Sequence, residues 1–225
     1  GNAVATRKDL RVRADTMSAD YKKLPPDNKT QITAVHARGS VIMSSTRADA
    51  FGDTLDYDLG KDSMLLQGTP AKVKTATETI TATDGITYYP NAQKAIAVGN
   101  VRADNGKDKV FGDKMIAYFE PKSPTDNALE MKRVEIYGNV KIINADTTVW
   151  ADKGIYHPQT GIVQLYEHIT IEQNGNRLHG DYAQSDLNSG ISKIMAGKTS
   201  KQRVTGVFKE KSKNKKSQPA ATEQK

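Results

Sequence analysis

The 225-residue sequence contains no cysteine, a single tryptophan and no uninterrupted run of 18 apolar residues. Without cysteine, disulfide bonds, thiolate catalysis and cysteine-based metal sites are excluded. Without a long apolar run, no helix is expected to cross a membrane. Hydrophobic residues make up 36% of the chain and aromatic residues only 6%. This low apolar content predicts a thin structure with much surface per residue instead of a compact core.

Catalytic and metal-binding motifs are also lacking. The histidines do not show the HExxH or His-x-His spacing of zinc sites, so we expect surface imidazoles at all four positions. These positions are His36, His157, His168 and His179. Phosphate-binding glycine loops, nucleophile elbows and triad orders are not found either. We therefore expect a protein that is not an enzyme and that carries neither a metal nor another cofactor.

The formal net charge is +7, and six lysines lie between positions 209 and 225. This last segment has no large apolar residue, so we expect residues 209–225 to form a basic, disordered tail and residues 1–208 to form a single domain. The positive charge favours an anionic partner and leaves nucleic-acid binding as one alternative. Aromatic residues interleaved with arginine on one face would support that alternative. None are visible in the sequence, so we expect no nucleic-acid partner.

What the sequence does contain is a motif that recurs six times: an apolar residue, any residue, a small residue and then aspartate. The six aspartates are Asp15, Asp53, Asp84, Asp113, Asp152 and Asp181. They follow one another at intervals of 38, 31, 29, 39 and 29 residues. A period of this length is typical of stacked repeats. We expect these aspartates to bond backbone amides at corners, as in Asx turns, rather than to bind metal.

A glycine before a valine-centred strand forms a second marker, at Gly39, Gly99 and Gly138. Each of these glycines lies 13 residues before the small residue of the aspartate motif, and Glu167 takes the same place in a fourth unit. Two segments rich in proline and Asn or Asp, residues 24–28 and 121–127, account for the longer intervals. We expect both segments to be loops, because proline interrupts strand ladders.

Between these markers, apolar and polar residues alternate with a period of two, which predicts strands with one apolar face. Asn-Gly and Asp-x-Gly sequences at the intervening turns favour hairpins, and hairpins require antiparallel neighbours. The predicted fold is therefore all-β: an elongated antiparallel roll of repeated hairpin units folded over an apolar interior. Its first and last strands have no partners within the chain, which predicts head-to-tail association through edge strands.

The Gly-Asn-Val strands at 99–101 and 138–140 are followed by Ala/Gly-Asp and then by tyrosine, as at Tyr118 and Tyr156. This pattern resembles the OstA-like repeats of the LptA-type lipopolysaccharide-transport proteins, from about Leu10 to Phe208. The resemblance implies a periplasmic β-jellyroll that binds the acyl chains of lipopolysaccharide, through its lipid A part, in its interior. It also implies an LptC-like inner-membrane protein and an LptD-like outer-membrane translocon as partners, joined by a head-to-tail bridge of aligned rolls. Glu167 in place of glycine, and Gly68 followed by Thr69-Pro70, depart from the pattern.

The in-phase apolar residues are the predicted lipid-binding interior. They are Val35, Ala37, Val41, Met43, Leu66, Val101, Val110, Val134, Ile136, Val140, Ile142, Val149, Val163, Leu165, Ile169, Ile171 and Leu178. Basic residues near the open rim are candidates for contacts with the lipid phosphates. They are Arg38, Arg102, Lys114, Lys141 and Lys153. We expect Trp150 to have a packing role. A β-solenoid that polymerises without a ligand remains an alternative function.

Overall fold

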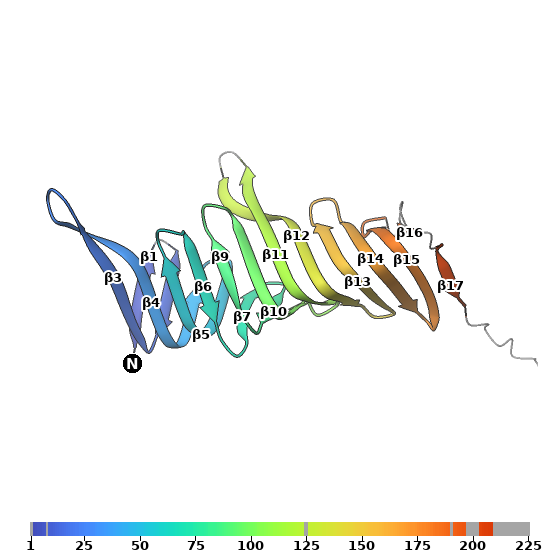
Figure 1. The fold of residues 1–225 in the computed structure, drawn as a ribbon, viewed down its shortest axis with the longest axis horizontal. Coiled ribbons are helices and arrows are strands. Elements are labelled where there is room, and N and C mark those ends of the chain that lie inside the picture. Colours follow the sequence, from blue (N-terminus) through green and yellow to red (C-terminus); the bar gives the residue numbers. More distant parts are fainter. Residues whose placement is uncertain (1, 8, 124–125, 190, 197–202, 209–225) are drawn as a thin grey trace, which may run out of the picture.

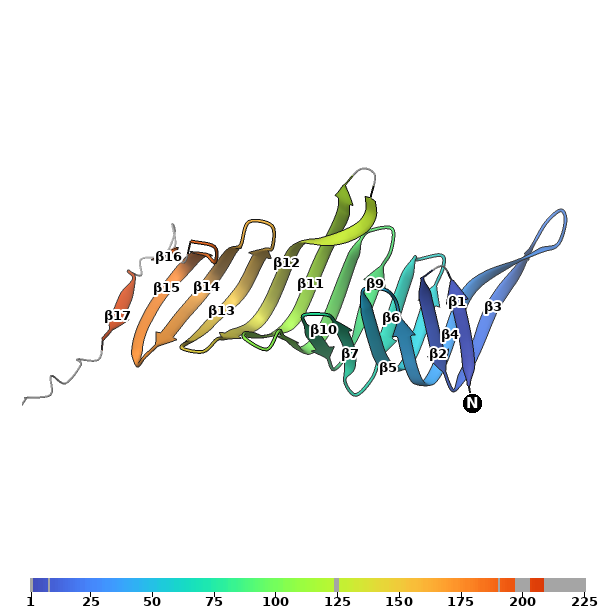
Figure 2. The ribbon, with the colours of Figure 1, turned by 180° about the vertical axis from the view of Figure 1, so that it is seen from behind.

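The computed structural model describes residues 2–7, 9–123, 126–189, 191–196 and 203–208. Within these residues the chain forms seventeen β-strands and no helix, so no helix of the described part could span a membrane. Figure 1 shows the strands side by side along one long axis, and Figure 2 shows the same order from behind. The predicted disordered tail, residues 209–225, lies outside the described residues.

The strands follow one another in short steps along the chain. They are β1 (Ala3–Arg7), β2 (Leu10–Ala14), β3 (Thr16–Leu24), β4 (Lys29–Ser44), β5 (Ala48–Asp58), β6 (Ser63–Gln67), β7 (Ala71–Thr75), β8 (Thr79–Ala82), β9 (Gly85–Tyr89), β10 (Lys94–Asp104), β11 (Lys109–Ser123), β12 (Asp126–Ile143), β13 (Thr147–His157), β14 (Ile162–Gln173), β15 (Asn176–Asp186), β16 (Ile191–Met195) and β17 (Thr205–Val207). Every described pairing is antiparallel, which confirms the predicted all-β antiparallel fold.

Each long strand has two halves with different neighbours. One half of β4 pairs with β2 and the other with β3, and β5 divides in the same way between β7 and β6. β10 pairs with β8 and β9, and β15 with β17 and β16. We call the part that contains β1, β2, β7, β8 and β17 half-sheet A, and the part that contains β3, β6, β9 and β16 half-sheet B. The line along which they meet is the crease.

The crease is marked by two-residue irregularities in the strand register. They fall at 39–40, 99–100, 138–139 and 167–168, and both residues of each pair have positive φ. Gly138, for example, has φ +71° and Asn139 has φ +47°. Glycine and asparagine adopt this left-handed conformation at low cost, which explains why Gly-Asn recurs in the sequence. Glu167 and His168 adopt the same conformation without glycine.

The most deeply buried side chains follow the crease. Val41, Val101, Val140 and Ile169 are each only 1% exposed. Each lies opposite a small residue of the neighbouring strand: Gly52, Gly112, Ala151 and Gly180. These small residues do not leave empty space, because a Cβ on Gly112 would lie 2.6 Å from the Ile136 Cγ1. The crease is therefore close-packed, and its glycines are required by the neighbouring side chains.

Two of the corner aspartates bond side chains and not the backbone amides of the expected Asx turns. Asp113 Oδ2 accepts from Asn139 Nδ2 at 2.9 Å, and Asp152 Oδ2 lies 2.7 Å from His168 Nδ1. Both partners belong to the crease irregularity of the next strand. Asx turns occur instead at the hairpin turns, where Asp104 Oδ1 accepts from the Gly106 amide at 2.9 Å. The described residues hold no group of three or more side chains suited to a metal ion.

One of the two expected loops is wrong. Residues 25–28 do form a turn, between β3 and β4, but β11 continues to Ser123 and β12 begins at Asp126, with Pro121 opposite Leu129. Proline is tolerated here because it lies near the end of a hairpin, beside a register irregularity, where a missing amide costs little. The β3–β4 hairpin reaches beyond one end of the body, and the β11–β12 hairpin projects from its middle (Figure 1).

Candidate functional site

All seventeen predicted interior residues lie on the inner face. Eight are buried: Ala37, Val41, Leu66, Val101, Ile136, Val140, Leu165 and Ile169. Nine are half-buried: Val35, Met43, Val110, Val134, Ile142, Val149, Val163, Ile171 and Leu178. All of them except Val35 and Leu178 belong to one apolar cluster that extends from β2 to β16. The inner face is thus a continuous apolar surface along the whole roll.

Burial on this face decreases with distance from the crease. On β12, Val140 and Ile136 are 1% and 5% exposed, whereas Val134 and Ile142, farther out on either side, are only half-buried. The same gradient holds on β14, from Ile169 out to Ile171. The half-buried residues are therefore the part of the inner face that remains accessible to a hydrocarbon ligand.

Several inner residues were not among the predicted ones. Leu55, Ile86, Ala97 and Met115 are buried in the same cluster. Leu55 and Met115 lie two residues after a corner aspartate, so counting by twos from that marker would have found them. Tyrosines also face inward: Tyr57 lies opposite Val35, and Tyr156 lies opposite Val134. Aromatic rings thus belong to the half-buried zone.

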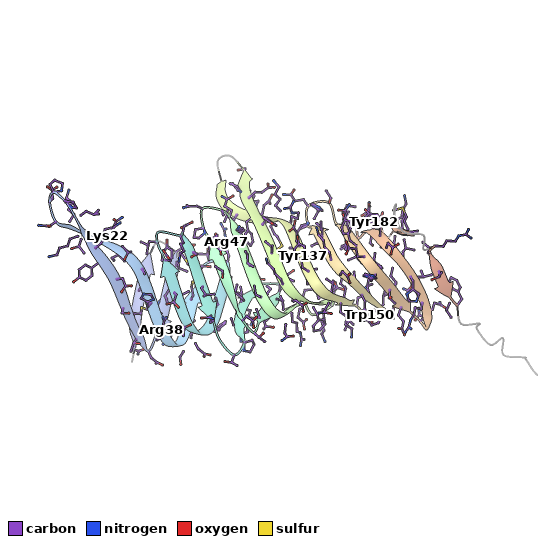
Figure 3. The ribbon with its side chains drawn as sticks, in the orientation of Figure 1. Lys22, Arg38, Arg47, Tyr137, Trp150 and Tyr182 are labelled. Carbon is purple, nitrogen blue, oxygen red and sulfur yellow. The ribbon has the colours of Figure 1, made fainter. Side chains whose placement is uncertain are left out.

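The two half-sheets approach each other at Arg47, in the turn between β4 and β5. Its Nη1 donates to the carbonyl oxygen of Leu129 on β12, at 3.4 Å. Burial raises the pKa of Tyr88, and the Arg47 guanidinium opposes this shift, so the charge lies close to that ring. Tyr88 pairs with Met64 on half-sheet B, whereas Arg47 extends from half-sheet A (labelled in Figure 3). Arg47 therefore connects the free margins of the two half-sheets. We call the opening between these margins the mouth of the roll.

The five basic residues predicted near the open rim lie on the outer face, and their contact with lipid phosphates stays a prediction. Arg38, Arg102, Lys114, Lys141 and Lys153 alternate with inner residues and lie within three residues of the crease. They are therefore on the outer face, and Arg38, Lys114 and Lys153 directly adjoin the crease. The Gly-Asn-Val and Ala/Gly-Asp markers are the sequence of the crease. Arg38 is already engaged by Asp56, at 2.5 Å.

The outer face does carry aromatic residues interleaved with cations, contrary to expectation. Cross-strand pairs place Lys72 over Phe51 at 4.7 Å, Arg102 over Phe111 at 5.8 Å and Lys141 over Trp150 at 5.6 Å. In half-sheet B, Lys153 lies between the rings of Tyr137 and Tyr166. Because each cation lies over a ring face, these pairs stabilise the sheet. Trp150 packs in this row and not in the interior.

A buried carboxylate organises the outer face of β12. Glu135 is 8% exposed and accepts from the Tyr137 hydroxyl at 2.7 Å and from the Tyr118 hydroxyl at 3.4 Å. Arg133 Nε lies 3.0 Å from the same carboxylate. The Glu135 carboxylate raises the pKa of Tyr137 to about 12. Outer polar groups of two neighbouring strands, β11 and β12, thus converge on one charge and stiffen the outer face at the centre of the roll.

A hollow of about 490 Å³ lies between the β7–β8 and β10–β11 turns. Its charged lining residues are Lys74, Glu78, Arg102 and Asp104. Arg102 is paired with Asp104 at 2.5 Å, so the positive and negative charges balance. This hollow lacks the apolar lining of the inner face, and the inner face remains the candidate site.

Comparison with known proteins agrees with this architecture. A family model described as LptA/(LptD N-terminal domain) LPS transport protein matches residues 1–94 and, a second time, residues 79–191. Among solved structures, LptH, described as the LptA homologous periplasmic component of the lipopolysaccharide transport device from Pseudomonas aeruginosa, matches with 16% identity and a TM-score of 0.50. That match covers 59% of this chain and 95% of LptH, and it establishes similarity of fold. No curated protein matches the sequence.

Proposed function

The chain belongs to the LptA/LptD N-terminal domain family of LPS transport proteins, and on this premise we propose that it carries lipopolysaccharide across the periplasm with the acyl chains against its inner face. The observation that supports this proposal most is the continuous apolar cluster from β2 to β16, with its half-buried outer zone. A small hydrophobic core does not require an apolar surface of this length and uniformity. It suits a hydrocarbon ligand that must be kept from water.

The driving force is the burial of apolar surface, roughly 0.8 kcal/mol for each CH₂ group removed from water. The accessible residues are of one kind along the roll: Met43, Val73, Val110, Val149 and Ile171 succeed one another in half-sheet A. Binding energy is therefore similar at each position. A lipid held in this way can move along the roll, because no position binds it much more tightly than the next. Transport requires this release as well as capture.

The phosphorylated head group would remain outside the mouth, where turns and not sheet faces meet the solvent. Arg47 is one of the described cations in these turns, and it bridges from the β4–β5 turn to Leu129. The outer cations near the crease are on the other face of the sheet. We assign the first head-group contact to Arg47 on this ground.

The partners implied by this role are an LptC-like protein at the inner membrane and an LptD-like translocon at the outer membrane. Edge strands support such contacts: β3 pairs only with β4, and β16 only with β15, among the described residues. Exposed strand edges accept another strand by β-augmentation. The same edges allow copies of the chain to join head to tail.

The test uses the full chain and purified lipopolysaccharide. Ile142→Asp places a carboxylate in the half-buried inner zone, and we expect at least about a tenfold loss of affinity, since burying a charge beside hydrocarbon is costly. Thr81→Asp is the control, because Thr81 faces outward between Lys72 and Arg102. Far-UV circular dichroism should be the same for both variants and the parent. Unchanged binding by Ile142→Asp would exclude the inner face as the lipid site.

A ligand-free, self-assembling β-solenoid is the alternative function. Mass spectrometry of a solvent extract from the purified chain separates the two. Copurified lipid A supports the carrier, whereas assembly without lipid, under conditions where lipopolysaccharide is present, supports the structural role.

A further inference from the structure

The chain contains two structurally equivalent starts. β2 and β3 flank Asp15 and pair with β4 on either side of Gly39, whereas β8 and β9 flank Asp84 and pair with β10 on either side of Gly99. The two registers agree: Met17 opposite Ala37 corresponds to Ile86 opposite Ala97. Ala37 and Ala97 each lie two residues before the crease glycine of their strand. The N-terminal edge of the roll is therefore a second copy of an element found in its middle.

The chain also contains two equivalent ends. β5 is followed by β6 and β7, which divide its edge between them, and β15 is followed by β16 and β17 in the same arrangement. Leu55 opposite Leu66 corresponds to Ala183 opposite Ile194. Phe51 opposite Lys72 corresponds to His179 opposite Thr205.

In the middle of the chain, the first end and the second start are already joined. β6 pairs with β9, with Leu66 opposite Ile86, and β7 pairs with β8, with Lys72 opposite Thr81. The segment shared by the two family matches, residues 79–94, contains β8 and β9. The β6/β7–β8/β9 contact is thus a covalently linked example of an end-to-start joint.

We propose that two copies of this chain join through the register of this internal joint, with β16 of one copy added to β3 of the next and β17 displaced. The proposal rests on the head-to-tail assembly in the proposed function and specifies its geometry. Transferring the β6–β9 register places Ile194 of one copy opposite Met17 of the next. Both residues are partly buried and pack on the apolar cluster of their own copy, so the joint would continue the inner face without a polar gap.

One strand must be displaced in this joint, because β17 of one copy and β1 of the next would occupy the same position. β1 pairs with β2 in the register in which β7 pairs with β8, with Ala3 opposite Ala14 as Ala71 is opposite Ala82. β17 also holds the β7 place, on β15. In a joint built like the internal one, only one of β1 and β17 can remain.

β17 is the strand that should leave. It has three residues paired with β15, whereas β1 has five paired with β2. All three residues of β17 are exposed, and Val207 is 67% exposed, so little burial is lost when the strand is displaced. Until then β17 covers half of the C-terminal edge. It acts as a removable cap that limits assembly of free copies.

The absence of cysteine in the parent chain allows a direct test by disulfide cross-linking. Equal amounts of Met17→Cys and Ile194→Cys chains are mixed and oxidised, and a covalent dimer is expected. In Figure 1 the blue N-terminal strands and the red β17 lie at opposite ends, so a link between these sites must join two copies. Lys22→Cys mixed with Ile194→Cys is the control, since Lys22 lies five residues along the β3 arm and should not cross-link.

A second pair of mixtures identifies the displaced strand. Val4→Cys with His179→Cys should cross-link if β1 of the next copy replaces β17. Cross-linking of Arg13→Cys with Thr205→Cys instead would show that β17 replaces β1, and would overturn the cap. A chain that ends at Arg203 should assemble more readily than the full chain, at least about threefold by the protein concentration at half-assembly.

Absence of a Met17–Ile194 cross-link would overturn the joint itself. Lipopolysaccharide binding by the same cysteine variants, measured before oxidation, separates this outcome from failure of the carrier function. Retained binding without cross-linking rejects only the joint. Melting temperatures of the variants establish that each chain is folded.

Discussion

Gly138 lies directly against Asp113 of the neighbouring strand: a Cβ on Gly138 would be 2.3 Å from the Asp113 Oδ2. The same closeness holds between Gly39 and Asp15 and between Gly99 and Asp84. Two sequence markers that are 15 to 25 residues apart, aspartate and glycine, are therefore the two sides of one contact at the crease. Each contact fixes where a strand turns from one half-sheet into the other.

Gly138→Ala should destabilise the fold by about 3 kcal/mol. The left-handed backbone costs alanine about 1–2 kcal/mol, and the contact with Asp113 adds the cost of overpacking. Gly106→Ala is the matched control, because Gly106 has φ +85° but nothing within 4 Å of the added Cβ. We expect the control to lose only the backbone part. Urea unfolding measures both, and equal losses would show that the aspartate contact is without effect.

Removal of the Glu135 carboxylate should cost roughly 1–3 kcal/mol, since it leaves the Tyr137 hydroxyl and Arg133 without their buried partner. Glu172→Ala is the control, as that residue forms an exposed pair with Arg177. The same variant, Glu135→Ala, should return the pKa of Tyr137 from about 12 toward 10, measured by ultraviolet titration of tyrosine. An unchanged titration curve would show that Glu135 does not raise the pKa of Tyr137.

His36 should make stability depend on pH. Hydrogen bonds to Asp56 and then Asp20 raise its pKa above 6.5, so the folded state binds the proton more tightly than the unfolded state. Its contribution is complete below about pH 6.5 and is lost as the pH rises through the folded value. The difference in unfolding free energy between the parent and His36→Gln should therefore be larger at pH 5.5 than at pH 9. A difference that grows with pH would contradict this assignment.

Neutral replacement of the outer lysines should leave lipopolysaccharide binding within about twofold. Lys141 and Lys153 cover aromatic rings on the outer face. Arg47→Gln, in contrast, should weaken binding, because it removes the cation that bridges the mouth. The three variants are compared at two salt concentrations, since a phosphate contact weakens with salt. A loss of affinity in Lys141→Gln equal to that in Arg47→Gln would place the head group on the outer face.

Much of this fold can be predicted from the local sequence pattern. The period of two, the turn residues and the recurring Gly-Asn and Ala/Gly-Asp markers determined the all-β antiparallel roll, its apolar inner face and its family resemblance, all of which are confirmed. These predictions are correct because alternation along a strand and positive φ at a turn depend on adjacent residues only. The seventeen inner positions follow from alternation for the same reason.

What the tertiary structure alone decided is which side of the roll each marker occupies. The sequence distinguishes one face of a strand from the other, but crease and rim are separated only when strands are bent and paired with distant neighbours. The basic residues predicted at the rim are for this reason on the outer face. The close contacts of Gly112 with Ile136 and of Gly180 with Ile194 likewise follow from the pairing of strands. The equivalence of the internal joint with the two ends of the chain likewise becomes visible only in strand registers, because register is a property of pairs of strands and not of either sequence alone.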